Sequence, residues 1–157
     1  MKRILIIDDA ANLRLLYQLE LEVEGYEVVA AGSGAEALEV LAQKKIDAVV
    51  MDLLLPDCFG LELLNEILSW QRHLPLIINT AYEQFRDNFQ TWGADAFVVK
   101  SSDLMELKGA LGRAISRRGP ASQFQPPREK RNPRRKSSPV LPRQLRHQDH
   151  GRAGALA

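Results

Sequence analysis

Cysteine is almost absent from this chain: Cys58 is the one example among 157 residues, which excludes a disulfide within the chain. A sequence of this kind fits a reducing compartment. Long apolar runs are also missing, and the first apolar stretch, residues 4–7, ends at two aspartates. That stretch is too short for a membrane span or for the apolar part of a signal peptide. We therefore expect a cytoplasmic protein with no membrane insertion.

Aromatic residues make up only 6% of the chain, and Phe124 is the one aromatic residue after position 118. With no other aromatic side chain there, this last part of the chain is poorly suited to stacking on single-stranded nucleic acid. It also contains no helix-turn-helix pattern. Binding of nucleic acid by this part would have to depend on charge.

A formal net charge of +1 conceals two parts of opposite sign. Residues 1–116 hold 10 Lys and Arg against 18 Asp and Glu, a balance of −8, whereas residues 117–157 hold 11 against 2, a balance of +9. Prolines interrupt the basic part, and apolar periodicity disappears there. We therefore predict a domain over residues 1–118 and a disordered basic tail over residues 119–157. The tail could be a solvated extension, a contact for nucleic acid or an acidic partner, or the mark of a truncated or altered C-terminus.

Short apolar runs alternate with helical patterns through residues 1–118, which predicts five βα units. Nearly continuous apolar runs are typical of parallel strands that have helices on both faces of the sheet. A TIM barrel needs roughly 250 residues, far more than this domain has. A doubly wound, five-stranded α/β sheet therefore fits best. The predicted strands are residues 4–7, 26–30, 48–51, 76–78 and 97–99.

The predicted helices follow the strands, and several carry start or stop signals. They cover residues 12–24, 33–41, 60–70, 83–92 and 102–115. In the first helix, the face expected to be buried carries Leu13, Leu16, Leu19 or Tyr17, and Val23. Ser33 and Glu36 form a capping-box signature at the start of the second helix. Ser101 or Ser102 is expected to cap the last one.

Polar residues stand at the end of four of the five predicted strands. Asp8 and Asp9 follow the first strand, Asp52 follows the third, Thr80 closes the fourth, and Lys100 follows the fifth. If the strands are parallel, these groups meet at the carboxyl edge of the sheet, where open α/β sheets bind their ligands. Each residue alone has a simpler explanation as a helix cap or surface residue, and only their convergence predicts a site.

Three carboxylates, a hydroxyl and an amine suit a divalent metal ion and a phosphoryl group. Mg²⁺ takes hard oxygen ligands, and without a cation three carboxylates this close would repel one another. The Lys100 ammonium and the Thr80 hydroxyl fit the oxygens of a transferring phosphoryl group. Aspartate can itself be the nucleophile and form an acyl phosphate. Asp52 lies between the flanking groups in strand order and is therefore the predicted acceptor.

A set of motifs in one order and spacing carries a family resemblance. The set comprises Ile6-Ile7-Asp8-Asp9 with Arg14, Asp52-Leu53-Leu54-Leu55-Pro56 with Gly60, Thr80-Ala81, Gly93-Ala94-Asp95, and Lys100. Over about residues 2–117 the chain resembles the receiver domain of bacterial two-component response regulators. The resemblance implies a flavodoxin-like sheet with the strand order 2-1-3-4-5.

The resemblance also implies the roles of the site residues. Asp52 would be the phosphoacceptor, and Asp9 and Asp52 would bind Mg²⁺ directly. Asp8 would bind the ion largely through water, and the Leu54 carbonyl would complete the protein ligands.

Three further positions follow from the same family pattern. Thr80 and Lys100 would contact the phosphoryl group, and Phe97 would be the aromatic side chain whose rotamer follows movement of Thr80. Simple packing of Phe97 in the core is an equal alternative.

Two departures from the family pattern stand near the site. The family usually has a proline after the lysine, joined by a cis peptide, whereas this chain has Ser101. A cis bond to a residue other than proline costs roughly 3 kcal/mol, which leaves the isomer of this bond open. Leu54 and Tyr82 are bulky where many relatives have polar or small residues.

By the resemblance, the chain is expected to be a stand-alone receiver. It is not expected to be an enzyme: its only reactions would be phosphotransfer to its own Asp52 and slow loss of that phosphate. Its donor would be a histidine kinase or a histidine phosphotransfer protein. A downstream protein would bind the face formed by the fourth helix, fifth strand and fifth helix. The alternatives are a receiver fragment or a regulator whose tail binds nucleic acid or an acidic partner, and an aspartate-nucleophile phosphatase. The phosphatase family has a second Asp where this chain has Leu54.

Overall fold

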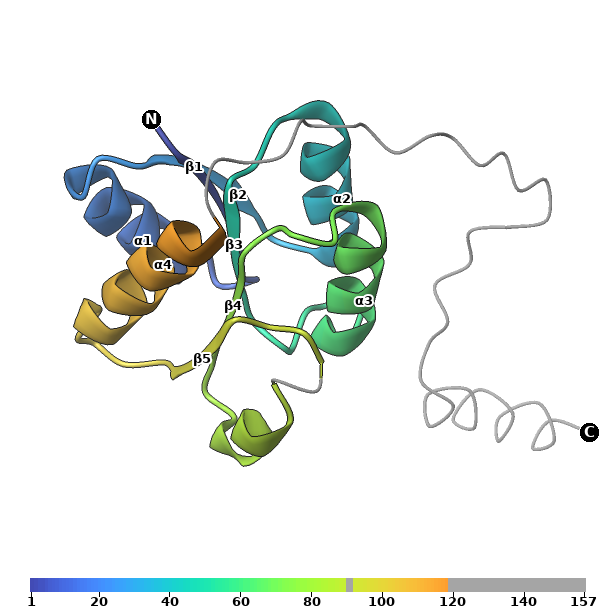
Figure 1. Ribbon diagram of the computed structural model, residues 1–157. Helices are drawn as coiled ribbons and strands as arrows, with labels where there is room; N and C mark the ends of the chain where they lie inside the picture. Colours follow the sequence, from blue (N-terminus) through green and yellow to red (C-terminus); the bar gives the residue numbers. More distant parts are fainter. Residues whose placement is uncertain (90–91, 119–157) are drawn as a thin grey trace, which may run out of the picture.

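The computed structural model describes residues 1–89 and 92–118. In this part of the chain, five parallel strands form one sheet in the order β2-β1-β3-β4-β5 (Figure 1). The predicted flavodoxin-like α/β sheet and its strand order are therefore confirmed. The predicted tail, residues 119–157, lies outside the described residues. The strands are β1 (Arg3–Ile7), β2 (Glu27–Ala31), β3 (Ala48–Met51), β4 (Leu76–Thr80) and β5 (Ala96–Val99).

Helices cover both faces of this sheet. In Figure 1, α1 and α4 lie on one side of the strands, and α2 and α3 lie on the other. A short 3-10 helix, η1, follows β4 near the edge strand β5. No helix of the described residues is both long and apolar enough to span a membrane. The helices are α1 (Ala11–Val23), α2 (Gly34–Gln43), α3 (Gly60–Trp70), η1 (Glu83–Asn88) and α4 (Met105–Arg118).

Two apolar clusters fill the space between the sheet and its helices. Because side chains alternate along a strand, successive residues of one strand enter different clusters. On β4, Ile78 belongs to the cluster under α2 and α3, whereas Ile77 belongs to the cluster under α1 and α4. This double coverage explains why the strands are apolar on both faces, and it leaves the strand ends as the place for polar groups.

The predicted buried face of α1 was correct only in part: Leu13 packs against the buried cluster, and Tyr17 is the buried one of the two alternatives. Tyr17 and Leu21 are buried, whereas Leu16, Leu19 and Val23 are 39%, 55% and 83% exposed. The sequence of α1 has large apolar residues on nearly all sides, so periodicity did not select one face. Contact with β1 and β2 selected the stripe that runs through Tyr17 and Leu21.

The fourth predicted helix, residues 83–92, was too long. The structure has only the six-residue 3-10 helix η1 there. Its sequence is mostly polar and exposes most of its side chains, so little apolar burial favours a longer helix. Phe85 within η1 and Phe89 directly after it are half-buried. Gly93 has φ +89°, a conformation that favours glycine, which agrees with its predicted role after the segment.

One helix cap was predicted correctly and the other was not. The Ser33 hydroxyl accepts a hydrogen bond from the Glu36 backbone N–H at 3.2 Å, which is the first bond of a capping box. The Glu36 carboxylate accepts from the Gly32 backbone N–H at 2.8 Å, one residue before the position that a complete capping box uses. At the start of α4, Asp103 Oδ1 accepts from the backbone N–H of Met105 at 3.0 Å. Ser101 accepts instead from the backbone N–H of Asp103 at 3.1 Å, so it shapes the preceding loop. The polar run before α4 offered three capping residues, and the loop geometry selected the third.

Candidate functional site: an acidic pocket at the carboxyl edge of the sheet

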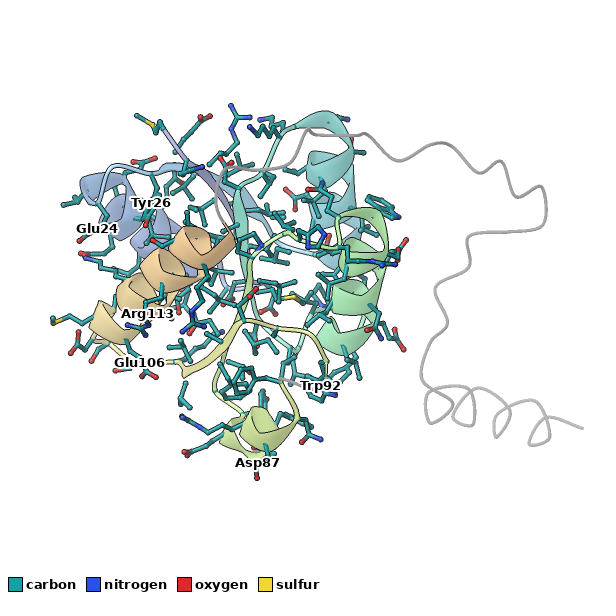
Figure 2. All side chains as sticks on the ribbon, in the orientation of Figure 1. Glu24, Tyr26, Asp87, Trp92, Glu106 and Arg113 are labelled. Carbon is teal, nitrogen blue, oxygen red and sulfur yellow. The ribbon has the colours of Figure 1, made fainter. Side chains whose placement is uncertain are left out.

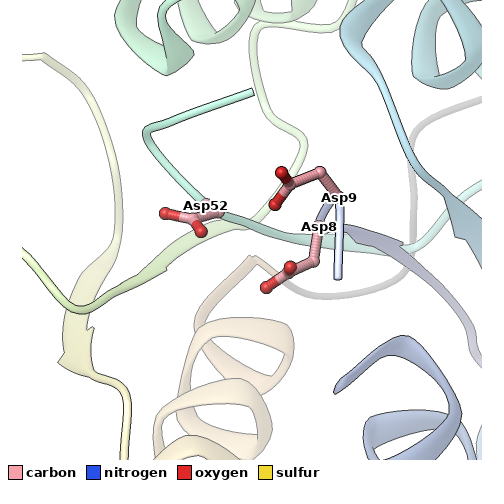
Figure 3. A group of neighbouring side chains, drawn as sticks. All are labelled: Asp8, Asp9 and Asp52. Atoms are coloured by element: carbon pink, nitrogen blue, oxygen red, sulfur yellow. The ribbon is translucent and has the colours of Figure 1, made fainter. Parts of the chain in front are cut away.

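Three carboxylates meet where β1 and β3 end. Figure 3 shows Asp8, Asp9 and Asp52 directed toward one space at this edge. One carboxylate oxygen from each of the three residues lies within 4.8 Å of the other two. The two strands are neighbours in the sheet, and the Asp52 backbone N–H donates to the Ile7 carbonyl at 2.9 Å. Strand pairing therefore places the first two carboxylates beside the third.

Lys100 brings its ammonium into this group from the end of β5. Its Nζ lies 2.7 Å from Asp8 Oδ2 and 2.6 Å from Asp52 Oδ2. Asp8 and Asp52 are 2% and 6% exposed, whereas Asp9 is open to solvent. Three carboxylates against one ammonium leave a formal surplus of two negative charges, which favours a divalent cation.

The carboxylates keep Lys100 charged. Burial alone would lower the pKa of its ammonium, but the hydrogen bonds and charges of Asp52 and Asp8 outweigh burial and raise the pKa above its ordinary value. The ammonium is therefore a fixed positive group at the site. Both of its carboxylate partners are buried, so these ion pairs are screened less than surface pairs.

Backbone groups fix the orientation of the carboxylates. Asp8 Oδ1 accepts from the backbone N–H of Ala10 at 2.9 Å, and Asp52 Oδ1 accepts from that of Leu54 at 3.4 Å. The Arg14 guanidinium donates to the Asp8 carbonyl at 2.7 Å. The loop after β1 is thus tied to the second turn of α1, which positions Asp8 and Asp9.

Gly60 lets the first turn of α3 approach the loop after Asp52. A Cβ added at Gly60 would lie 2.7 Å from Leu53 Cα and 2.9 Å from the Asp52 carbonyl oxygen, which no larger side chain permits. The Gly60 backbone N–H donates to the Leu53 carbonyl at 2.6 Å. The sequence contained Gly60 as part of a motif, but this reason for it becomes visible only in the structure.

Thr80 stands at the same sheet edge, on β4. It is fully buried, and its hydroxyl accepts from the backbone N–H of Tyr82 at 3.4 Å. The Lys100 backbone N–H donates to the Thr80 carbonyl at 2.8 Å. The five polar residues predicted to converge, Asp8, Asp9, Asp52, Thr80 and Lys100, therefore do end at one edge.

Phe97 lies below this edge on β5 and is 6% exposed. It pairs with Ile78 in the register, so it points to the same face of the sheet as Thr80. The Arg86 guanidinium lies 5.6 Å from its ring centroid, and the Phe89 ring lies 6.1 Å from it. Phe97 thus packs between the sheet and η1.

Apolar side chains stand at the rim of the pocket. Leu54 is 42% exposed and Tyr82 is 39% exposed, and both follow site residues by two positions. Among the described residues there is no cis peptide bond, so Ser101 follows Lys100 through a trans bond.

This constellation matches a known family. The family model for the response regulator receiver domain matches residues 4–112. The chain belongs to that family. The predicted resemblance is therefore confirmed for the receiver domain itself.

The curated relatives of this receiver domain are longer proteins. It is 37% identical over 121 residues to transcriptional regulatory protein GlrR of Escherichia coli, which covers 76% of this chain and 27% of GlrR. It is 38% identical over 122 residues to response regulator ArlR of Staphylococcus saprophyticus, which covers 76% of this chain and 54% of ArlR. The chain thus spans about a quarter to about a half of these relatives.

Solved receiver structures match over nearly their whole length. Response regulator TrrA of Thermotoga maritima, solved in complex with Mg(2+)-BeF, is 39% identical with a TM-score of 0.69, covering 73% of this chain and 99% of TrrA. TrrA in complex with the histidine kinase ThkA matches at 39% identity and a TM-score of 0.68, covering 73% of this chain and 98% of TrrA.

Proposed function

We propose that this receiver domain accepts a phosphoryl group on Asp52 from a phosphohistidine of a histidine kinase or a histidine phosphotransfer protein. The observation that carries the proposal is the convergence of Asp8, Asp9 and Asp52 with the Lys100 ammonium at one sheet edge. The relative TrrA, which was solved in complex with a histidine kinase, supports this class of donor.

In the proposed step, an Asp52 carboxylate oxygen attacks the phosphorus atom while the bond from phosphorus to the donor imidazole nitrogen breaks. The imidazole leaves with the electron pair, and Asp52 becomes an acyl phosphate. Lys100 already lies 2.6 Å from Asp52 Oδ2, so its ammonium is placed to neutralise a phosphoryl oxygen. Thr80 is the proposed hydroxyl donor to another phosphoryl oxygen, because its oxygen only accepts from the Tyr82 backbone N–H and its own proton is still available to donate.

The carboxylates fit Mg²⁺. Ligand oxygens of an octahedral magnesium ion lie about 3 to 4 Å apart. One carboxylate oxygen each of Asp8, Asp9 and Asp52 lies within 4.8 Å of the others, so a small movement of the side chains would bring them to such an ion. We propose that Asp9 and Asp52 hold the ion directly, Asp8 through water, and the Leu54 carbonyl as a further ligand. The bound ion would supply positive charge that offsets the negative charge of the phosphoryl oxygens.

We propose the exposed apolar side of α1 as the donor's docking surface, and we call Leu15, Leu16, Leu19 and Val23 the α1 apolar surface. A donor histidine must reach the Asp52 carboxylate, so the donor protein must cover the edge at which α1 begins. The four side chains are 39% to 83% exposed. An apolar surface of this kind next to a site fits a protein partner with its own apolar helix face.

The output surface is proposed on η1, β5 and α4, where the sequence predicted it. Phe97 and its contacts with Arg86 and Phe89 connect β5 to η1. If Thr80 moves toward the phosphoryl group, the neighbouring space on its sheet face changes, and Phe97 shares that face. Phosphorylation would then shift the population of η1 conformations that a downstream protein binds.

The test is phosphorylation of the full chain by acetyl phosphate with Mg²⁺, followed by intact-mass measurement. We expect one phosphoryl group, lost on treatment with hydroxylamine as an acyl phosphate should be. Asp52→Asn should abolish the gain, and Asp9→Ala should weaken Mg²⁺ binding. Asp87→Asn, at the exposed tip of η1 in Figure 2, is the matched control and should be labelled like the parent chain. Equal labelling of Asp52→Asn would refute the assignment.

Beyond this transfer and slow loss of the phosphate, we propose no turnover of other substrates, because position 54 holds leucine where an aspartate phosphatase has its second aspartate. A cytoplasmic location fits a donor of this class. Contact of nucleic acid with residues 119–157 remains a prediction from charge alone.

A further inference from the structure

The cluster under α1 and α4 contains two polar side chains in an otherwise apolar layer. Tyr17 of α1 is 2% exposed and Asn79 of β4 is 4% exposed. The Asn79 amide lies within hydrogen-bonding reach of the Tyr17 hydroxyl and opposes the rise in its pKa. Among the described residues, neither Tyr17 nor Asn79 has a side-chain nitrogen or oxygen that is both fully buried and without a hydrogen-bond partner.

Packing alone does not explain this pair. An aliphatic residue at each position would fill the layer without any polar group to satisfy. A hydroxyl and an amide must instead be removed from water, and one hydrogen bond compensates that loss only partly. The pair is therefore expected to serve something other than core packing.

Its position points to the phosphorylation site. Asn79 directly precedes Thr80 and pairs with Val98 in the sheet register. Val98 lies two residues before Lys100, so Asn79, Val98 and Lys100 leave the sheet on one face, the face that α1 and α4 cover. Tyr17 reaches this face from the helix that follows Asp8 and Asp9.

Charges at the site act on Tyr17. Burial raises the pKa of its phenol most, and the Asn79 amide and the Lys100 charge oppose that rise, while Asp8 and Asp52 add to it. The phenol is thus within electrostatic reach of the ammonium and of both of its carboxylate partners.

We propose that Tyr17 and Asn79 are positioning residues, which together form a polar floor beneath the Lys100 side chain and hold its ammonium between Asp8 and Asp52. The inference rests on the proposed phosphorylation of Asp52. A lysine stem has many rotamers, and an ammonium must already stand at the acceptor when the phosphoryl group arrives. A purely aliphatic floor would offer the stem no fixed polar neighbour and would let the ammonium move away toward solvent.

The test compares Tyr17→Phe and Asn79→Leu with the parent chain, using acetyl phosphate at saturating Mg²⁺. We expect the phosphorylation rate to fall roughly three- to tenfold, the effect of losing one hydrogen bond, while the Kd for Mg²⁺ stays unchanged. The NMR resonance of the Lys100 ammonium should shift or broaden in both variants. Tyr26→Phe is the matched control: it removes a phenol hydroxyl beside the same cluster, just before β2 begins, and should change neither readout.

A double variant, Tyr17→Leu with Asn79→Val, separates positioning from stability. It restores an apolar layer, so its stability should return to that of the parent chain or above it. If the pair positions Lys100, the phosphorylation rate stays low and the resonance stays altered. A parent-like rate and resonance in this variant, or in Tyr17→Phe, would overturn the proposal. If the parent chain itself took no phosphoryl group, the proposed function would fail, and the Lys100 resonance would still decide whether the floor holds the ammonium.

Discussion

At the scale of single residues, the site is built from groups that constrain one another. Lys100 bonds to both buried carboxylates, and those carboxylates are held in turn by backbone N–H groups. Substitution of Lys100 would leave two buried negative charges without their cation, which is far more costly than the loss of a surface ion pair. The same constraint means that an incoming divalent ion meets carboxylates that are already placed.

The apolar rim makes a prediction about the lifetime of the phosphorylated form. Hydrolysis of an acyl phosphate needs a water in line with the leaving Asp52 oxygen. Leu54 has no group to orient a water, and Tyr82 can cover the phosphoryl oxygens, so we expect slow hydrolysis. In the variant Leu54→Asn with Tyr82→Glu, the new polar groups can orient a water molecule. If this lowers the activation free energy of hydrolysis by about 1 kcal/mol, the loss of phosphate becomes about fivefold faster.

Loss of phosphate is followed by intact mass after the donor is removed. Ala42→Asn is the control, since Ala42 is exposed on α2, away from the site and from the proposed partner surfaces, and it should leave the rate unchanged. Equal rates in the double variant and the parent chain would contradict this role of the rim and leave the Asp52 assignment intact.

Cys58 makes a second prediction at this scale. Burial, with Asp57 next to it, raises the pKa of the Cys58 thiol from 9.0 to about 11. The thiolate is the form that reacts, so alkylation of the folded chain near neutral pH should be roughly a hundredfold slower than of the unfolded chain. Mass spectrometry after treatment with iodoacetamide, with and without denaturant, measures the ratio. Asp57→Asn should speed the reaction of the folded chain. Similar rates in the folded and unfolded chain would show that Cys58 is not protected.

At the scale of elements, the loop after β3 holds the start of a distant helix. Asp57 accepts from the backbone N–H groups of Gly34 and Ala35 at 2.8 and 2.9 Å, so it caps α2 across 23 and 22 residues of chain. The loop that carries Asp52 is thereby tied to α2 as well as to α3. Burial alone would raise the pKa of Asp57, but these backbone donors outweigh burial and lower it below 3.8.

Removing this cap should destabilise the domain in a pH-dependent way. Because the folded pKa of Asp57 is depressed, its contribution is present above the ordinary pKa of 3.8 and is lost as the pH falls through the folded value. We expect Asp57→Ala to lower the free energy of unfolding by about 1 kcal/mol near neutral pH. The difference from the parent chain should vanish in acid. Urea titrations at several pH values measure it, with Asp87→Ala as control. A loss that persists unchanged in acid would assign the effect to something other than the cap.

Elements also show which features the sequence could predict. The strands and the order of the helices could be predicted from the apolar periodicity and from the residues that end each run. The runs are apolar on both faces, and four of the five end at a polar residue. The buried face of α1 did not follow, because Leu15, Leu16 and Leu19 compete with Tyr17 and Leu21 and only contact with the sheet decides. The predicted length of the fourth helix was wrong for a similar reason. Its sequence has a helical pattern, but it has too little apolar surface to stabilise a longer helix by burial. Asn79 could be noticed in the sequence because it is a polar residue in an otherwise apolar run. Its neighbour Tyr17 could be identified only from the three-dimensional structure.

At the scale of the whole molecule, the site was predicted mainly from the rule that parallel α/β sheets bind ligands at the carboxyl ends of their strands. No single local motif was as informative. Asp8, Asp52 and Lys100 are far apart in sequence, and parallel pairing alone brings their atoms within ion-pair distance. The sequence did not predict the distances within the site, the complete burial of Thr80 or the close approach of the backbone at Gly60. These features depend on how the loops pack, and the spacing of residues along the sequence does not determine that packing. The difference in charge between residues 1–116 and residues 117–157 was visible in the sequence, and it raises the question of whether the basic segment contributes to folding or to binding of nucleic acid.

That question is tested by deleting residues 119–157. The apolar clusters of the described residues are formed entirely between Ile4 and Ile115, so the domain should fold without the deleted segment. We expect its melting temperature to stay within about 2 °C of the full chain and its phosphorylation rate to stay unchanged. The remaining residues 1–118 hold 12 Lys and Arg against 18 Asp and Glu, a balance of −6, which repels nucleic acid. Any salt-dependent binding of duplex DNA by the full chain, measured by fluorescence anisotropy, should therefore disappear on deletion. Binding that persists in the shortened chain would place the contact on the domain, and a large fall in melting temperature would show that the deleted segment packs against it.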